Sequence, residues 1–251
     1  MRIVAIHHIK GGVGKTTAAA NLAYLAARGG ARVLLWDLDP QGAATFHFRV
    51  RPKLAGGARK LVRPGRSLEP QVRASDFHNL DLLPADFSLR NLDLHLDRAK
   101  KPRQFLARVG RDLAPDYDLL LVDCPPGFSL LTESIYQGSD YILVPIIPAI
   151  LSLHTLDQLR KFLPRLKKKR VPELLPFLSM VDIRKKDHLE LAKRVVHGYQ
   201  DFLRSPIPAA AVVEQMGRRR LPLEVYAPRT VAAASFRQLW KEVHLAIGLP
   251  E

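Results

Sequence analysis

The residues of this chain that are best suited to chemistry form a short glycine-rich segment near its start. The segment is Lys10-Gly11-Gly12-Val13-Gly14-Lys15-Thr16-Thr17. Glycines have no Cβ, so the backbone can turn tightly and aim its N–H groups inward at phosphate oxygens. Lys15 can reach the β and γ phosphates of a nucleotide, and the Thr16 hydroxyl can ligate Mg²⁺, which prefers oxygen ligands. The segment therefore predicts a nucleotide-binding loop.

The elements beside this segment decide whether it can work as a phosphate loop. An apolar run at 3–6 precedes it, and an alanine-rich helical pattern at 18–26 follows it. A helix that starts at the loop adds free N–H groups and the positive end of its dipole. Because the glycine-rich segment lies between a strand and a helix, we favour a phosphate loop over a plain glycine-rich turn. One departure stands out, because Ile9 occupies the first glycine position of the common pattern and Lys10 follows it.

Three acidic residues stand at the ends of two apolar runs. Asp37 and Asp39 follow the run at 32–36, and Asp123 follows the run at 118–122. Near-continuous apolar runs are typical of strands that are buried on both faces of a parallel sheet. Ligands of such sheets bind beyond the carboxyl ends of the strands. A single Asp at a strand end is usually a turn or cap residue, but three of them beside a phosphate loop predict convergence on the bound phosphates.

The order of elements along the chain indicates one α/β domain over residues 1–251 with a doubly wound, mostly parallel sheet flanked by helices. Strands are expected near 2–8, 31–37, 79–83, 118–123, 140–145 and 174–181. Helices are expected near 15–28, 86–98, 102–113, 129–137, 152–169, 186–200 and 230–247. Alternation of this kind favours crossover helices on both faces. The segment 51–66 is expected to be a mobile loop or short insertion, and Pro206 and Pro208 mark a late loop.

With these motifs the chain resembles the ParA/MinD group of deviant Walker ATPases, and within it the ParA-like partition and cargo-positioning proteins. The matching segments are 10–17, 37–42 and 121–126, with weaker matches at 79–85, 141–145 and 226–229. The resemblance spans nearly the whole chain. Its most specific part is Lys10 together with Asp37-Leu38-Asp39-Pro40-Gln41. It implies a P-loop NTPase fold with ATP and Mg²⁺ as cofactors.

The resemblance also implies roles at the matching positions. Lys10 is similar to the signature lysine, which crosses a dimer interface to the nucleotide of the partner subunit. Lys15 is similar to the Walker A lysine, and Asp39 to the acid that positions or activates the attacking water. Asp123 is similar to the Walker B acid, which holds Mg²⁺ through water. Thr16, Asp37 and Asp123 are the expected metal-site residues, residues 11–17 are the expected nucleotide contacts, and the loop at 206–208 is expected near the adenine.

The composition limits which kinds of site the protein can have and where in the cell it is expected. The only cysteine of the chain is Cys124, so an internal disulfide is excluded and a local zinc or iron–sulfur site is disfavoured. We interpret Cys124 as a small residue packed beside its strand. There is no signal-peptide pattern, and no apolar run approaches the ~20 residues that a membrane-spanning helix needs. A cytoplasmic protein without stable membrane insertion is expected.

Charge is the second strong signal in the sequence. The chain carries a formal net charge of +15, and no acidic residue lies between Asp39 and Glu69. Seven basic residues fall in that interval, and further basic runs lie at 160–170, 184–186 and 218–220. One such run is usually a solvated face, but together they favour a polyanion partner, bound through its backbone without sequence preference. The favoured DNA contacts are Arg184, Lys185, Arg218, Arg219 and Arg220, because the C-terminal half carries the DNA surface in the proteins that the chain resembles; the run at 160–170 is a weaker candidate.

The resulting hypothesis is a nucleoid-associated ATPase that forms a homodimer with ATP and binds nonspecific DNA. A cargo-bound adaptor protein would stimulate hydrolysis, and a plasmid, chromosome region or protein assembly would be positioned or segregated. The alternative is a MinD-like ATPase at a membrane surface, although 236–251 looks like the last packed helix of the domain. A reductase similar to the nitrogenase iron protein is disfavoured, because its cluster needs two cysteines from each subunit. An ATP-dependent ligase would leave the basic surface unexplained.

Overall fold

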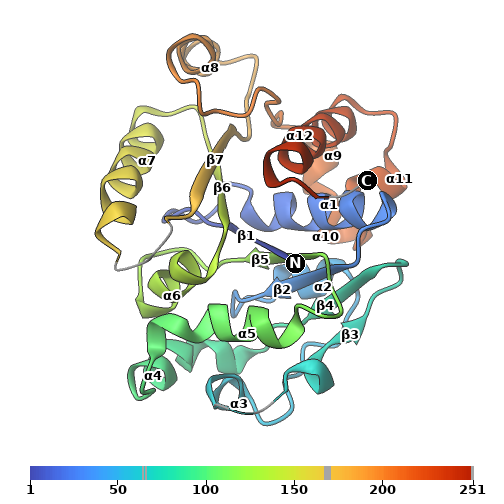
Figure 1. Ribbon diagram of the computed structural model, residues 1–251. Helices are drawn as coiled ribbons and strands as arrows, with labels where there is room; N and C mark the ends of the chain where they lie inside the picture. The colour runs from blue at the N-terminus through green and yellow to red at the C-terminus, as the bar shows by residue number, and fades with distance from the viewer. Residues whose placement is uncertain (64, 66, 167–170, 250–251) are drawn as a thin grey trace.

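The computed structural model describes residues 1–63, 65, 67–166 and 171–249, and its centre is a seven-stranded sheet (Figure 1). The strands are β1 (Arg2–Ile6), β2 (Val33–Asp37), β3 (Arg73–Ala74), β4 (Leu80–Leu83), β5 (Leu119–Asp123), β6 (Tyr141–Ile146) and β7 (Glu173–Leu178). Their order across the sheet is β3-β4-β2-β5-β1-β6-β7, and only β3 pairs antiparallel. The expected doubly wound, mostly parallel sheet is confirmed.

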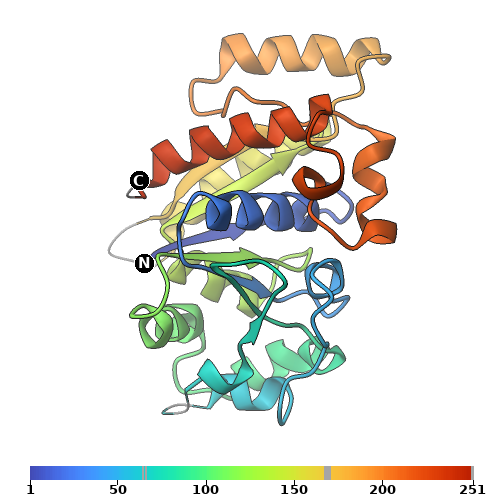
Figure 2. The same cartoon turned by 90° about the vertical axis from the view of Figure 1, so that its right-hand side faces the viewer.

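Alternating side chains of the central strands feed two hydrophobic cores, one on each face of the sheet. In β5, Leu120 and Val122 join one core, whereas Leu119 and Leu121 join the other. Helices cover both faces, as Figures 1 and 2 show. Burial on both faces explains why these strands are apolar at every position until the terminal acid.

The helices of the two layers have the following bounds. One face packs against α1 (Lys15–Arg28), α2 (Ala43–His47), α10 (Met216–Arg219), α11 (Leu223–Tyr226) and α12 (Val231–Ile247). The other packs against α3 (Ala58–Val62), α4 (Leu92–Asp97), α5 (Phe105–Leu113), α6 (Leu130–Gly138), α7 (Ile150–Phe162) and α8 (Lys186–Gly198). A short helix, α9 (Ala211–Glu214), follows α8 and precedes α10 along the chain.

Two expectations about local structure need correction. The segment 51–66 is not simply a loop, because α3 lies within it and buries Ala58 and Leu61. The helix expected at 152–169 ends at Phe162, and a 3₁₀ turn with Pro164 follows it at Leu163–Arg165. A helical interior disfavours proline, which explains the early end. The rest of that basic run, 167–170, and Arg66 lie outside the described residues.

Candidate functional site

The phosphate loop joins the end of β1 to the start of α1, as the sequence predicts. Gly12 and Gly14 have φ angles of 69° and 91°, a conformation that side chains with a Cβ rarely adopt. A Cβ on Gly14 would also lie only 2.9 Å from the Oγ of Ser179. The Ser179 hydroxyl itself donates a 2.9 Å hydrogen bond to the Val13 carbonyl oxygen. Glycine at position 14 is therefore required by backbone conformation and by the closeness of Ser179.

The start of α1 is open to an anion. Gly14 occupies the N-cap in a left-handed conformation, no side chain of the described residues caps the helix, and its first turn contains no acid. Lys15 is only 6% exposed, and its Nζ donates a 3.2 Å hydrogen bond to the Lys10 carbonyl oxygen. Burial lowers the pKa of Lys15, while Asp123, Cys124 and Asp39 act in the opposite direction. Free helix N–H groups and a loop-bound ammonium together suit a phosphate group.

Asp123 is a fully buried carboxylate at the carboxyl end of β5. It is 0% exposed, and neither of its side-chain oxygens has a hydrogen-bond partner among the described residues. Burial raises the pKa of Asp123 well above its usual value, Asp37 and Asp39 raise it further, and Thr16 and Lys15 lower it. A buried polar group without a partner is costly. A hydrated Mg²⁺ beside the Thr16 hydroxyl would satisfy these oxygens, so the residues present fit the cofactor.

Asp37 lies beside Asp123 in the sheet, because the two residues are register partners in β2 and β5. Its carboxylate is already engaged. One oxygen accepts 2.8 Å hydrogen bonds from both the N–H and the hydroxyl of Thr45, and the other accepts from the Asp39 N–H at 3.2 Å. Burial raises the pKa of Asp37 to about 6. These contacts hold α2 and the Asp39 backbone in place, a positioning role that the sequence did not indicate.

Asp39 and the loop open into a cavity of about 490 Å³, a size typical of small-molecule sites. Asp39 is partly exposed, and its Oδ1 accepts a 2.9 Å hydrogen bond from the Gln41 N–H. The described lining includes the loop residues Gly11, Gly12, Gly14, Lys15, Thr16 and Thr17. Asp39 therefore lies at the same cavity as the phosphate loop, whereas the buried Asp37 and Asp123 are not among the lining residues.

The far wall of the cavity comes from the C-terminal half of the chain and is largely apolar. Its apolar residues include Phe177, Ile207, Pro208, Ala210, Val213 and Phe236, and Glu214 also lines this part of the cavity. The sequence pointed only to the loop with Pro206 and Pro208. The other wall residues had no local signal, because long-range packing of β7, α9 and α12 brings them together. Such a wall suits the flat face of a nucleobase.

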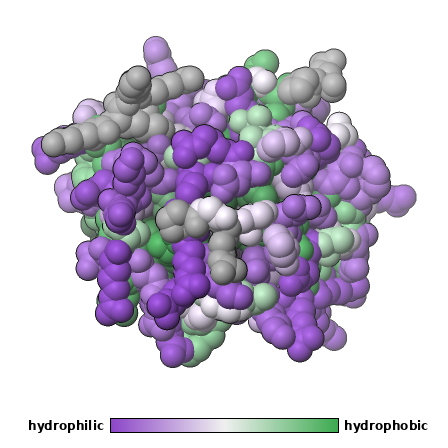
Figure 3. Space-filling model, turned by 60° about the horizontal axis from the view of Figure 1, so that its bottom comes forward, coloured by the Kyte–Doolittle hydropathy of each residue, from purple (hydrophilic) through white to green (hydrophobic). Residues whose placement is uncertain are grey.

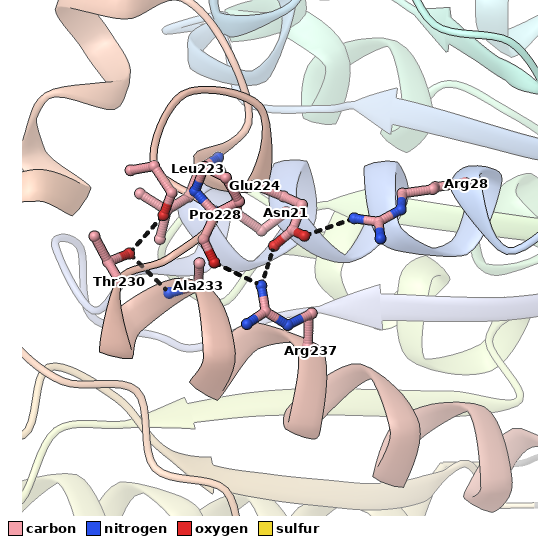
Figure 4. A network of polar contacts seen from close by, with 9 residues as sticks. Asn21, Arg28, Leu223, Glu224, Pro228, Thr230, Ala233 and Arg237 are labelled. Atoms are coloured by element: carbon pink, nitrogen blue, oxygen red, sulfur yellow. Dashed lines mark hydrogen bonds and ion pairs between the residues drawn. The ribbon is translucent and has the colours of Figure 1, made fainter.

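A polar network fastens the C-terminal helices to α1, the helix that carries the phosphate loop (Figure 4). Glu224 accepts 2.6 Å hydrogen bonds from Arg28 on α1 and Arg237 on α12. The Asn21 Oδ1 accepts a 2.8 Å hydrogen bond from the Leu223 N–H. The phosphate loop and the C-terminal wall of the cavity are therefore both connected to α1.

Lys10 lies at the edge of the loop and is not among the residues that line the cavity. Its backbone N–H donates a 3.0 Å hydrogen bond to the Nδ1 of His8. Its partly exposed side chain forms no ion pair with any residue that the structure describes. The Lys10 ammonium is therefore available to a group outside its own site.

The expected DNA contacts fall into two groups on separate elements. Arg184 and Lys185 precede α8, whereas Arg218, Arg219 and Arg220 lie at the end of α10, and Figures 1 and 2 show α8 well apart from α10. Arg184 is 85% exposed but forms two 2.9 Å hydrogen bonds with Asp182. The Nε of Arg220 donates to the Phe46 carbonyl oxygen at 3.0 Å, and its guanidinium lies over the Phe46 ring. Arg218, Arg219 and Lys185 are exposed.

The glycine loop, the acids at strand ends and the sheet order define the class of P-loop nucleotide-binding proteins. A family model described as an AAA domain matches residues 1–175. The chain belongs to that family and, within it, to the ParA/MinD group of ATPases, whose relatives include chromosome-partition proteins.

Two relatives and one solved structure illustrate the similarity. The sporulation initiation inhibitor protein Soj of Bacillus subtilis is 29% identical over 96% of this chain and 98% of its own length. The chromosome partitioning protein ParA of Myxococcus xanthus is 30% identical over 82% of this chain and 73% of its own length. Cobyrinic acid a,c-diamide synthase of Mycobacterium smegmatis, solved with ADP and magnesium, has a TM-score of 0.79 at 25% identity, and the match covers 100% of this chain and 98% of that one.

Proposed function

We propose that this protein is a ParA-like ATPase that dimerises on ATP, binds DNA without sequence preference and positions a cargo through partner-stimulated hydrolysis. ATP and Mg²⁺ are its cofactors. The observation that carries the nucleotide part is the unpartnered pair of Asp123 oxygens beside Thr16 and the phosphate loop. Mg²⁺ held there supplies charge neutralisation at the phosphates, which is most of what phosphoryl transfer requires. Thr16 and Asp123 would hold the ion, while Asp37 keeps Asp39 in position.

A face-to-face dimer is supported by the surface around Lys10. Large apolar side chains are exposed after the carboxyl ends of strands β5, β6 and β7, on the edge of the sheet where the phosphate loop follows β1. They are Phe128, Ile150, Leu151, Met180 and Ile183, between 40% and 78% exposed. Clustered exposed apolar residues mark interfaces. A partner subunit on this edge would cover them and would bring its nucleotide to the free Lys10 ammonium.

DNA binding is supported by the net charge of +15 and by the exposed cations at 184–186 and 218–219. The adaptor protein and the cargo are proposed from the partition relatives alone. The membrane alternative is weaker, because α12 buries its apolar face against the domain, including Phe236, Leu239 and Val243. No helix among the described residues is long and apolar enough to cross a bilayer.

One experiment separates the two functions. Purified protein is mixed with ATP or ADP, and its binding is measured in parallel to a random-sequence DNA duplex and to anionic phospholipid vesicles. The proposal expects DNA binding that is stronger with ATP than with ADP and is equal for unrelated sequences, with no vesicle binding. ATP-dependent pelleting with vesicles and indifference to DNA would establish the MinD-like alternative instead.

A further inference from the structure

A second hollow, of about 740 Å³, lies between α3, the turn after α4, and α5. These elements are at the bottom of Figure 1, whereas α8 is at the top, so the hollow is remote from the cations at 184–186. Its described lining contains seven lysine and arginine side chains and no Asp or Glu. They are Arg59, Arg63, Arg98, Lys100, Lys101, Arg108 and Arg111, and we refer to this hollow as the α3–α5 cation groove.

No ion pair among the described residues neutralises the cations of the groove. None of the seven cations forms an ion pair with another residue of the described ranges, although nearby Arg103 pairs with Glu133 at 2.6 Å. Arg108 is held by a 3.0 Å hydrogen bond to the Leu61 carbonyl oxygen, and Asp112 is the acid whose charge acts on it. Like charges gathered in one hollow repel one another and raise the local concentration of anions.

The side chains indicate phosphate as the anionic group. Five of the seven cations are arginines, whose planar guanidinium pairs with phosphate through two parallel hydrogen bonds. An acidic protein partner would need large apolar anchors as well. The lining offers only Val62 and Ala99, and Val62 is 8% exposed. Figure 3, which views the molecule from this side, shows a surface that is mostly hydrophilic.

We propose that the α3–α5 cation groove binds the phosphate backbone of duplex DNA from within a single subunit. The inference rests on the proposed function for its ligand, but it places a DNA contact in the N-terminal half of the chain. It also gives a role to the basic, acid-free stretch between Asp39 and Glu69, part of which meets the basic turn at 98–101 here. The single groove of a subunit without nucleotide binds duplex DNA weakly. A dimer formed with ATP has two grooves, and it binds more tightly wherever both grooves contact the same DNA.

The test measures duplex binding by the nucleotide-free full-length protein over a range of salt concentrations. Each phosphate contact contributes about −0.9 to the slope of log K against log salt. Arg98→Gln with Arg111→Gln should therefore make the slope shallower by about 2 and weaken low-salt binding by about tenfold or more. The control pair, Arg229→Gln with Lys241→Gln, removes the same charge from exposed residues beside and on α12 and should leave the slope unchanged. Thermal melting verifies that all variants fold.

The outcomes separate this inference from the proposed function. Equal slopes for the two variant pairs would overturn the groove, and so would binding of tripolyphosphate or a polyglutamate peptide without binding of the duplex. If DNA binds only with ATP and the groove variants match the wild type, the groove is not a DNA contact, whereas the proposed ATP-dependent DNA binding is supported. If DNA binding depends on the groove but is the same with ATP, with ADP and without nucleotide, the groove is supported as a DNA contact and the proposed ATP dependence is contradicted.

Discussion

The hydroxyl of Ser179 donates a 2.9 Å hydrogen bond to the carbonyl oxygen of Val13, and this contact joins the phosphate loop to the segment that follows β7. Ser179 is 3% exposed, and its own N–H donates to the Ile146 carbonyl oxygen at 2.8 Å. The same segment leads into α8 and the cations at 184–186. The shape of the loop and the path of the chain toward α8 are therefore linked by one side chain.

We expect Ser179→Ala to weaken ATP binding about fivefold, since a lost hydrogen bond costs about 1 kcal/mol. The carbonyl oxygen of Val13 would lose its partner, and the loop would be less well held before nucleotide arrives. Titration with a fluorescent ATP analogue measures the effect. Ser75→Ala, at the β3–β4 turn, removes a comparable hydroxyl far from the loop and should bind ATP as the wild type does. Equal affinities for all three proteins would show that the contact does not support the loop.

Asp39→Ala is expected to bind ATP but not to turn it over, and so to accumulate as an ATP dimer. The reason is that the variant keeps the phosphate loop but loses the carboxylate expected to position the attacking water. Lys15→Ala should fail at the earlier step, because it removes the side-chain ammonium from the phosphate loop. Phosphate release and size-exclusion chromatography with ATP distinguish the two variants. Hydrolysis at the wild-type rate by Asp39→Ala would contradict the assigned role.

Lys10→Ala tests whether the free lysine acts on the partner subunit. The variant should bind ATP as a monomer and should neither dimerise nor hydrolyse ATP. Mixing it with Lys15→Ala pairs an intact phosphate loop from one chain with an intact Lys10 from the other. If the two subunits share an interface, adding one variant should change the dimerisation or the ATP hydrolysis measured for the other. Complete independence of the two proteins, at concentrations where the wild type dimerises, would count against it.

The structure changes how the C-terminal DNA contacts should be tested. Reversing all of Arg218, Arg219 and Arg220 would disturb the contact between Arg220 and Phe46 as well as the surface charge. Arg218→Glu with Arg219→Glu retains that contact and should lower ATP-dependent DNA affinity by orders of magnitude at moderate salt, because two cations become two anions. ATP-dependent dimerisation should be unchanged. A duplex titration in ATP makes the comparison, and undiminished affinity would move the DNA surface elsewhere.

Acid should destabilise the protein through His7, which is fully buried. The Gly127 carbonyl oxygen can only accept, so the Nε2 of His7 donates to it at 3.1 Å and Nδ1 accepts from the Tyr136 hydroxyl at 2.7 Å. Burial lowers the pKa of His7 to about 3 from the ordinary 6.5. As the pH falls, His7 is protonated in the unfolded chain before it is protonated in the folded protein. The contribution of neutral His7 to the free energy of unfolding is therefore fully present above pH 6.5 and is lost as the pH falls toward 3.

At pH 5 the loss through His7 should be about 2 kcal/mol relative to pH 7.5. Urea unfolding at the two pH values measures it. His7→Gln keeps an N–H for the Gly127 carbonyl oxygen but cannot titrate, so its stability should vary less with pH. Some dependence will remain, because burial also lowers the pKa of His8 to about 4. An identical pH dependence in variant and wild type would exclude His7 as the source.

Local patterns predicted the strand–loop–helix unit at 2–28 and the buried strands, because each of those signals lies within a short stretch of sequence. They did not predict β3, which is two residues long, or α2, whose start is held by the carboxylate of Asp37. Nor could they place Ser179 against Val13, because 166 positions separate the two residues. The cavity wall from β7, α9 and α12 was missed for the same reason, since it exists only after the chain has packed.

The position of Cys124 makes this chain convenient for reporter chemistry. It is the only cysteine in the sequence, it is fully buried, and burial raises the pKa of its thiol well above the usual value. A thiol that stays protonated and enclosed reacts slowly with maleimides. A single cysteine placed at Ile150 or at Arg98 could therefore carry a dye in the otherwise native sequence. Subunit contact and DNA arrival could then be followed optically in separate preparations, without first removing a native thiol.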